Sequence, residues 1–341
     1  MKYASFGRTA YLLDEYSPEF DSYVQNARER NDRLLVPLDG RRFRKANYAW
    51  TTNGFASVRQ SLLVTAKRSY RSRKLSAQGA ARQLNLLQMY KELADSYARH
   101  LTYDVTHVVI AQNLLPFLWK TGHLGGRTFD VLMSALPMNE LQKRLDAANS
   151  LHPESGTLGD FRADPDLVFA EQEALRHARE VITSHTDIAS LFPKRGKLLD
   201  WKAPNVAAHL TRSPNEKPVI VFPASTVARK GCYELRDAFR GLDVKLIILG
   251  GLIESPDFWV GFDVERGSDN CLEVADLVVL PAFVEHRPRR LLRAAASGVP
   301  VLATSACGVD GVENVTTVRA GESTELRRLI IEQIRRSRAS I

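Results

Sequence analysis

The chain has 341 residues and a formal net charge of +8, with 44% hydrophobic and 25% charged residues, a composition that excludes collagen-like, disulfide-rich and wholly disordered proteins. Its length predicts two domains that each bury a core, and no run of 18 apolar residues is present to cross a membrane. The N-terminus lacks the order of a secretion signal, and Cys232, Cys271 and Cys307 are too few and scattered for disulfides or a metal site, so we expect a cytoplasmic protein with reduced thiols and no metal.

The first half of the chain predicts an α/β domain. Ser17, Pro18 and Glu19 are typical of a helix start, and the apolar run 34–38 predicts a buried strand. The expected elements are a helix over 17–31, strands over 34–38, 105–111, 128–133 and 181–183, helices over 114–120 and 170–179, and a polar surface loop over 150–166.

One segment makes the protein basic. Residues 40–91 contain twelve basic and no acidic residues, so the rest of the chain carries 35 basic and 39 acidic residues. Apolar spacing predicts helix from Ser57 to Lys91, broken near Gly79, and five cations crowd its middle: Lys67, Arg68, Arg71, Arg73 and Lys74. Such a helix suits the anionic inner face of a membrane, although a solvated helix face is the alternative. No nucleic-acid-binding signature is present, so no nucleic acid is expected.

The second half predicts another α/β domain. The proposed boundaries are an acceptor-side domain over 1–203, a linker over 204–217, a second domain over 218–322 and a C-terminal helix over 323–341. Strands are expected over 219–222, 244–249, 277–280 and 299–303, and helices over 233–240, 289–297 and 323–337. Continuous apolar strands that alternate with helices indicate a parallel sheet covered on both faces. Ligands bind beyond the carboxyl ends of such strands, and between two such domains.

Three loops follow these strands. The first ends in Arg229, Lys230 and Gly231 at the start of a helix, where charge and backbone N–H groups favour an anion; an exposed basic turn is the alternative. The second is Gly250-Gly251, which lets a backbone approach a flat ligand closely, or is a plain turn. The third carries Glu285 among arginines, which fits either a salt-bridged helix cap or contacts to a sugar and a diphosphate.

Together these loops resemble the C-terminal domain of GT-B glycosyltransferases of the family 4 type. The resemblance covers roughly residues 217–321, and its motifs occur in the family's order: Arg229-Lys230-Gly231, Gly250-Gly251, Ala275-Asp276, Leu280-Pro281, Glu285 and 298–304 (GVPVLAT). It implies an α/β fold of the GT-B class, with two Rossmann-like domains whose parallel sheets face each other across a cleft.

The resemblance also implies an activity. A sugar would move from a nucleotide-sugar donor to a cell-surface polysaccharide, a glycolipid or another glycoconjugate, with retention, without a metal and without a further cofactor. Arg229, Lys230 and Glu285 would be catalytic. The donor would be bound by Gly231, Gly250, Gly251, His286, Arg287, Arg289 and Leu291, with the loop 267–271 beside the base.

The sequence departs from the family at several positions. Arg293 stands where the family has a second glutamate, and His286-Arg287-Pro288 replaces a glycine-aromatic-glycine. Gln112 or Asn113 replaces a histidine that contacts the donor sugar, so acceptor-side candidates are Gln112, Asn113 and the loop residue His123; His185 is open to the same interpretation. Three alternatives follow: a divergent transferase, an inactive GT-B homologue that binds a ligand or partner, or a nucleotide-sugar epimerase.

Overall fold

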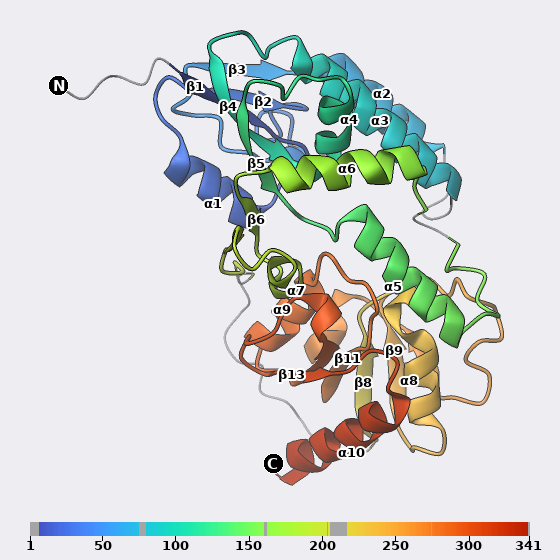
Figure 1. Cartoon of the computed structure of the whole chain (residues 1–341). Coiled ribbons are helices and arrows are strands. Elements are labelled where there is room, and N and C mark those ends of the chain that lie inside the picture. Colours follow the sequence, from blue (N-terminus) through green and yellow to red (C-terminus); the bar gives the residue numbers. More distant parts are fainter. Residues whose placement is uncertain are drawn as a thin grey trace. The chain divides into compact units, whose positions relative to one another are not determined.

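The computed structural model describes residues 7–74, 80–159, 162–202, 204, 217–273 and 275–339. The chain forms two compact units (Figure 1). The first unit contains residues 1–139, 160–184 and 188–202, and the second contains 140–159, 185–187 and 203–341. Apart from its end residues Pro204 and Lys217, the expected linker 204–217 lies outside the described residues.

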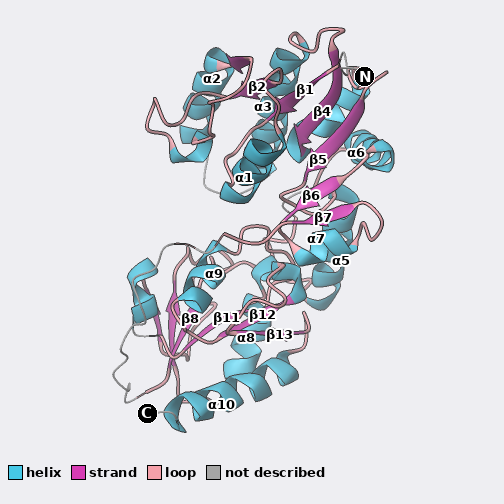
Figure 2. Cartoon of the chain, turned by 90° about the vertical axis from the view of Figure 1, so that its left-hand side faces the viewer, coloured by secondary structure: helices cyan, strands magenta, loops and turns pink. Residues whose placement is uncertain are grey.

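The first unit is built on a sheet of seven parallel strands in the order β3-β2-β1-β4-β5-β6-β7. The strands are β1 (Arg8–Leu12), β2 (Arg33–Val36), β3 (Ser57–Gln60), β4 (Val105–Ala111), β5 (Thr128–Leu132), β6 (Val181–Thr183) and β7 (Gly196–Leu198). The chain adds β2 and β3 on one side of β1 and β4 to β7 on the other (Figure 2). The strand order therefore reverses between β1 and β4.

Helices and apolar side chains enclose this sheet. The helices are α1 (Pro18–Ala27), α2 (Leu62–Arg73), α3 (Ala80–Ala98), α4 (Leu115–Lys120) and α6 (Pro165–His177), with short turns η1 (Ala46–Tyr48) and η2 (Gln112–Leu114). α1 begins at Ser17, whose hydroxyl accepts the Phe20 N–H, and Pro18 fits its first turn. Tyr11, Leu34 and Trp50 are each at most 2% exposed and belong to one buried apolar cluster.

The second unit holds a sheet of six parallel strands in the order β10-β9-β8-β11-β12-β13. They are β8 (Val219–Phe222), β9 (Lys245–Ile248), β10 (Val264–Arg266), β11 (Leu277–Leu280), β12 (Val301–Thr304) and β13 (Val315–Val318). Every residue of β8, β11 and β12 is buried, as expected of strands covered on both faces. The strand order reverses between β8 and β11.

The helices of the second unit come from three separate stretches of the chain. They are α5 (Met138–Leu151), the start of α7 (Thr186–Ser190), α8 (Cys232–Phe239), α9 (Arg289–Ala296) and α10 (Ser323–Ala339), with turns η3 (Ala228–Lys230), η4 (Asp269–Glu273) and η5 (Ser305–Cys307). α10 packs on α8 and closes its end, because Arg327 Nη1 donates to the carbonyl oxygens of Ala238 and Arg240 at 2.8 and 2.6 Å. None of the described helices is both long and apolar enough to cross a membrane.

Most predicted elements are confirmed, but two regions differ and one prediction is not tested. Residues 57–60 are not helical; they form the edge strand β3, which pairs with β2. The predicted break at Gly79 lies outside the described residues. The predicted surface loop 150–166 is shorter than expected, because α5 runs to Leu151 and Asp164 caps α6 from Pro165.

Candidate functional site

The candidate site lies where the strand order of the second sheet reverses. The loop after β8 leads into η3, which carries Arg229 and Lys230, and the loop after β11 carries Glu285. Loops on the two sides of such a reversal diverge and leave room for a ligand beyond the carboxyl ends of the strands. The topology therefore brings the cationic turn and the acid to one edge of one sheet.

The two loops are joined through their backbones. The N–H groups of Phe283 and Val284 both donate to the Arg229 carbonyl, at 3.0 and 3.2 Å. Gly231 has φ +76°, and a Cβ there would lie 2.1 Å from the Pro281 carbonyl oxygen. Only glycine permits this approach, so Gly231 acts by holding the two loops together.

Lys230 and Glu285 form an ion pair. Lys230 Nζ lies 3.0 Å from Glu285 Oε2 and 2.8 Å from the Val284 carbonyl oxygen, and the two side chains are only 15% and 14% exposed. Glu285 Oε1 accepts the Arg287 N–H at 2.8 Å. Burial raises the pKa of Glu285, but Lys230 and this N–H lower it further, so the net pKa lies below its ordinary value and the carboxylate is ionised at neutral pH.

Two histidines flank the acid. His185 Nε2 lies 2.8 Å from the Glu285 carbonyl oxygen, and its buried ring packs on Gly308, where a Cβ would come within 2.2 Å of the ring. Burial lowers the pKa of His185. Burial and the nearby Lys230 lower the pKa of His286 to about 3. Both rings are therefore neutral at pH 7.

The loop after β12 completes this edge, a contribution that the sequence analysis did not identify. The Thr304 hydroxyl donates to the Ala282 carbonyl, and the Glu285 N–H donates to the Ala306 carbonyl at 3.3 Å. These bonds fix the loop after β11 from its far side. The sequence does hold a signal for this loop. The motif 298–304 contains β12 and ends with it at Thr304, so the residues that follow lie at the carboxyl edge of the sheet.

The glycine pair has a packing role at its first position. A Cβ on Gly250 would lie 2.3 Å from the Ser225 backbone nitrogen, so the loop after β9 passes directly against the loop after β8. Gly251 is less constrained, since a Cβ there would meet only the Ile253 side chain, at 3.4 Å. The Gly251 N–H donates to Ser225 Oγ at 3.1 Å and its carbonyl accepts the Thr226 N–H at 2.8 Å.

The arginines near the start of α9 have different surroundings. Arg287 is exposed and Arg289 is partly exposed. Arg290 donates to the Pro223 carbonyl at 2.9 Å and pairs with Asp269 at 3.0 Å. Arg293 lies 4.0 Å from the same Asp269, in η4. The predicted donor-binding residue Leu291 is 1% exposed and packs in the core.

In the first unit, Gln112 is fully engaged in internal hydrogen bonds. Its side chain donates to the Leu136 carbonyl and to Glu171 Oε1, both at 3.1 Å, and accepts the Ala135 N–H at 3.0 Å. Gln112 is 7% exposed and Glu171 is 1% exposed. Burial raises the pKa of Glu171 to about 7. Gln112 therefore ties the end of β4 to the neighbouring loop and to α6.

Asn113 lies at the reversal of the first sheet. Its Nδ2 donates to Asp14, which follows β1 and is buried. Arg68 donates to Asp14 Oδ1 at 2.6 Å and to Glu15 Oε1 at 3.1 Å, and its guanidinium lies over the Tyr90 ring. Arg68 is thus a buried structural cation and not a surface one. The sequence analysis missed Asp14 and Glu15 because it did not identify β1.

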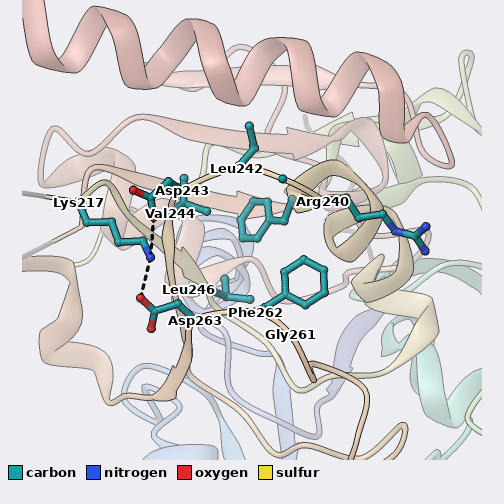
Figure 3. Close-up of a pocket in the computed structure, with 11 residues that line it drawn as sticks. Lys217, Arg240, Leu242, Asp243, Val244, Leu246, Gly261, Phe262 and Asp263 are labelled. Carbon is teal, nitrogen blue, oxygen red and sulfur yellow. Dashed lines mark hydrogen bonds and ion pairs between the residues drawn. The ribbon is translucent and has the colours of Figure 1, made fainter.

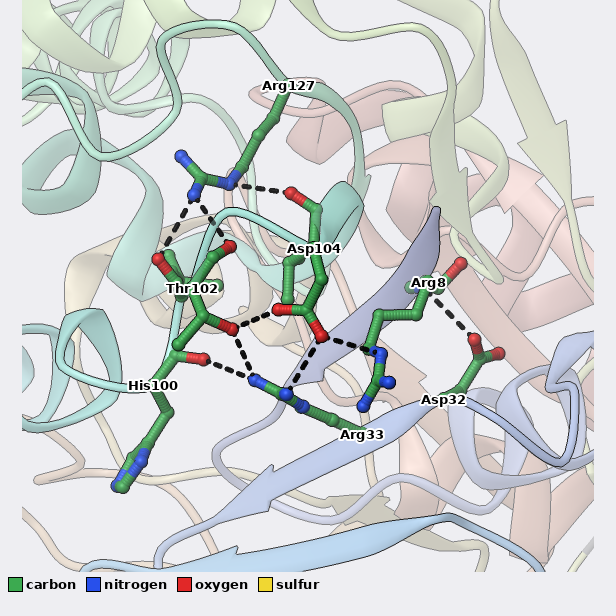
Figure 4. A network of polar contacts seen from close by, with 10 residues as sticks. Arg8, Asp32, Arg33, His100, Thr102, Asp104 and Arg127 are labelled. Carbon is green, nitrogen blue, oxygen red and sulfur yellow. Dashed lines mark hydrogen bonds and ion pairs between the residues drawn. The ribbon is translucent and has the colours of Figure 1, made fainter. Parts of the chain in front are cut away.

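His123 is not brought together with Gln112 and Asn113. It lies in the exposed loop between α4 and β5, where the strands begin, and its carbonyl accepts from Arg127 at 3.0 Å. At this edge Arg8 and Arg33 pair with Asp104 at 2.9 and 3.0 Å (Figure 4). These groups satisfy one another and tie strand starts together.

A hollow of about 490 Å³ lies at the starting edge of β8, β9 and β10, opposite the candidate site (Figure 3). Lys217 Nζ bridges Asp243 and Asp263 across it, at 2.9 Å from each. The Lys217 cation is therefore already occupied by two carboxylates of the protein. Within the described ranges, no group of three or more His, Cys, Asp or Glu side chains is arranged to hold a metal ion.

No protein-family model and no curated protein matches the chain. Several solved structures, in contrast, match the fold of the chain. A sucrose-phosphate synthase from Thermosynechococcus elongatus matches with TM-score 0.56 and 13% identity over 97% of this chain and 90% of that one. The lipopolysaccharide outer core galactosyltransferase WaaB (TM-score 0.55, 10% identity) and the lipopolysaccharide-biosynthesis glycosyltransferase WaaG (0.50, 14%) each match over 96% of this chain and 90% of theirs. The chain therefore has the predicted GT-B fold, which it shares with these structures.

Proposed function

We propose that the protein is a glycosyltransferase that moves a sugar from a nucleotide-sugar donor to a cell-surface polysaccharide, glycolipid or other glycoconjugate. The observation that carries this proposal is the Lys230–Glu285 pair, 3.0 Å apart at the strand-order reversal of the second sheet. In the GT-B fold, this edge of a parallel sheet suits a nucleotide. The three structures described above, which share the fold, are a synthase and two glycosyltransferases.

The chemistry of donor cleavage supports this assignment. Negative charge grows on the departing nucleoside diphosphate, and fixed cations stabilise it without reorganising. Lys230 and Arg229 on η3 supply such cations from within the protein. Glu285 is ionised and anchors Lys230, and the same carboxylate is suited to accept a hydrogen bond from a sugar hydroxyl. The resemblance to family 4 adds the proposal that transfer is retaining and metal-independent.

On the first unit, we propose that the acceptor contacts the strand-order reversal beside Asn113. Asn113 contacts the buried Asp14, and the next residue, Glu15, has a partly exposed carboxylate. Hydroxyl-rich ligands bind such acceptor groups. His123 lies at the opposite edge of the sheet and Gln112 is engaged internally, which favours Asn113 among the three candidates.

We further propose that the first unit contacts an anionic membrane surface, as expected of a protein that acts on a lipid-linked acceptor at the inner face of a membrane. α2 exposes Leu62, Leu63 and Tyr70 beside the exposed cations Arg73 and Lys74. Apolar and cationic side chains on one helix face favour an anionic lipid surface. Arg68, in contrast, is committed to Asp14.

The proposal is tested by donor binding and turnover. We expect at least one nucleoside diphosphate among UDP, GDP and ADP to raise the melting temperature by mass action, and a matching sugar nucleotide to be hydrolysed or transferred. Lys230→Ala should lower that turnover at least about 100-fold, as removal of an electrostatic transition-state contact does. Glu285→Gln combined with Lys230→Ala leaves no orphaned charge and should be equally inactive.

Lys217→Ala is the matched control, because it removes a paired cation of the same unit at the opposite edge of the sheet. Its turnover should stay within about twofold of wild type. Full activity of Lys230→Ala would reject the site. A wild-type protein that binds no nucleoside diphosphate and cleaves no sugar nucleotide would instead support the inactive homologue.

A further inference from the structure

The turn that carries Arg229 and Lys230 is held by a hydroxyl from a distant stretch of the chain. η3 has no side-chain cap from its own N-terminal residue, and the first N–H groups of a helical turn lack partners within it. Thr157 supplies one: its Oγ1 accepts the Ala228 N–H at 3.1 Å in a buried hydrogen bond across 71 residues. Thr157 belongs to the stretch 140–159 that the second unit incorporates.

Glu254 orients that hydroxyl. Thr157 Oγ1 donates to Glu254 Oε2 at 2.8 Å. A hydroxyl has one proton and two lone pairs, so donation to a carboxylate leaves a lone pair for the Ala228 N–H. Thr157 is 8% exposed, and water therefore has little access to replace either bond.

Glu254 also binds the chain on both sides of the turn. Its Oε1 accepts the Tyr233 hydroxyl at 2.9 Å, and Tyr233 lies in the first turn of α8. Its backbone N–H donates to the Thr226 carbonyl at 3.0 Å. One residue thus connects Thr226 before the turn, Ala228 at its start through Thr157, and Tyr233 after it.

On its other side, the turn η3 is held by hydrogen bonds to the loop after β11. Lys230 reaches the Val284 carbonyl and Glu285 at 2.8 and 3.0 Å, while the Arg229 carbonyl is fixed by the loop after β11. η3 is therefore held from two sides, by the loop after β11 and by the group of Thr157, Thr226, Ala228, Tyr233 and Glu254, which we call the Glu254 clamp.

We infer that the Glu254 clamp sets the backbone of residues 226–231, and that Thr157 and Glu254 are positioning residues for the anion-binding turn. The identity of the anion, a nucleoside diphosphate, rests on the proposed function. The proposed rigidity of the turn does not rest on that function, because every hydrogen bond in the Glu254 clamp joins two groups of the protein itself. The inference thus adds a stretch far upstream in the chain to the parts that shape the donor site.

Thr157→Val tests the inference, because valine keeps the shape of threonine and removes the hydroxyl. Backbone hydrogen exchange of residues 226–233 is measured without ligand, and dissociation constants are measured for UDP, GDP and ADP. We expect exchange in this segment to rise about tenfold and the dissociation constant of the bound diphosphate to rise about five- to tenfold, as for loss of one buried hydrogen bond. Glu254→Gln should change both quantities in the same direction.

Thr157→Ser keeps the hydroxyl and should restore both quantities to within about twofold of wild type. Thr317→Val is the matched control, since it removes a hydroxyl bonded to a carboxylate, Asp310, at 2.9 Å on the edge strand β13; it should change neither quantity. Unchanged exchange in Thr157→Val overturns the clamp. If wild type binds none of the diphosphates, the proposed function fails, and exchange alone decides the clamp.

Discussion

At the scale of single residues, Gly231 shows how a backbone requirement shapes the candidate site. Its φ of +76° and the 2.1 Å that would separate a Cβ from the Pro281 carbonyl oxygen both exclude a side chain. Gly231→Ala should therefore lower the free energy of unfolding by about 3 kcal/mol, because strain and a backbone clash combine. Urea unfolding at pH 7 measures this change.

Gly241 provides the matched comparison. It has φ +70°, but a Cβ there would meet nothing within 4 Å. Gly241→Ala should thus cost only the conformational strain, about 1 kcal/mol. Equal losses in the two variants would contradict the close approach of Gly231 to Pro281.

Glu285 should make stability depend on pH in the acid range. Burial opposes ionisation of Glu285, but Lys230 and the Arg287 N–H outweigh it, so the pKa is lower in the folded state than in the unfolded chain. The carboxylate then stabilises the fold fully above its unfolded pKa and loses this contribution as the pH falls through its folded pKa. Glu285→Gln should flatten this part of the stability curve, as urea unfolding at several values between pH 7 and pH 3 would measure.

A curve for Glu285→Gln that runs parallel to that of wild type over this range would contradict the ion pair. Asp263→Asn is a suitable control, because Asp263 pairs with a lysine at the opposite edge of the same sheet. Asp263 is half exposed, so solvent screens its ion pair with Lys217.

The sequence predicted part of this site at the residue scale. The edge rule for parallel strands correctly indicated that Lys230 and Glu285 follow strands whose ends meet, but it could not show that they touch. Leu291 was predicted to bind the donor although it faces the core. Thr157 and His185 contact the site from stretches far upstream in the chain. No local sequence pattern predicts these contacts, because they form only when the second unit incorporates residues 140–159 and 185–187.

At the scale of elements, α2 is the part of the basic segment with the clearest exposed face. Lys67 and Arg71 pair with Glu92, and Arg68 is buried, so Arg73 and Lys74 are the cations of this helix that remain exposed at its end. Charge reversal of these two should weaken pelleting with anionic vesicles at least tenfold, since each cation near the surface contributes about 1 kcal/mol. Wild-type pelleting should also fall as salt rises.

Lys120→Glu combined with Lys143→Glu is the control, because both lysines are exposed on other helices. This variant should pellet like wild type. Vesicle binding that does not change with salt concentration, or that is unchanged after charge reversal at Arg73 and Lys74, would contradict a membrane contact through α2.

Most of the strands that the sequence predicted are buried, although the largely buried β1 was missed as well. β8 and β11 are apolar throughout and β12 is apolar except for Thr304, so their sequences predicted buried strands. The strands that were missed include β3, β7 and β10, whose residues are partly or wholly exposed. β3 was taken for helix because its four residues carry no apolar alternation and adjoin a true helix; pairing with β2 overrides local preference.

At the scale of the whole molecule, a donor should affect the two units differently. All predicted diphosphate contacts belong to the second unit. A bound nucleoside diphosphate should therefore slow hydrogen exchange most in the loops 223–231 and 281–290. Protection of comparable size confined to the first unit would show that the diphosphate binds elsewhere.

The chain enters the second unit before its first sheet is finished. Residues 140–159 and 185–187 belong to the second unit, yet each is followed by more of the first. A fragment cut at the predicted linker would thus separate Glu234 and Glu254 from His152 and Thr157, and Glu285 from His185. During synthesis, residues 140–159 emerge before most of the second unit exists, so that unit can be completed only after the later part of the chain has been made.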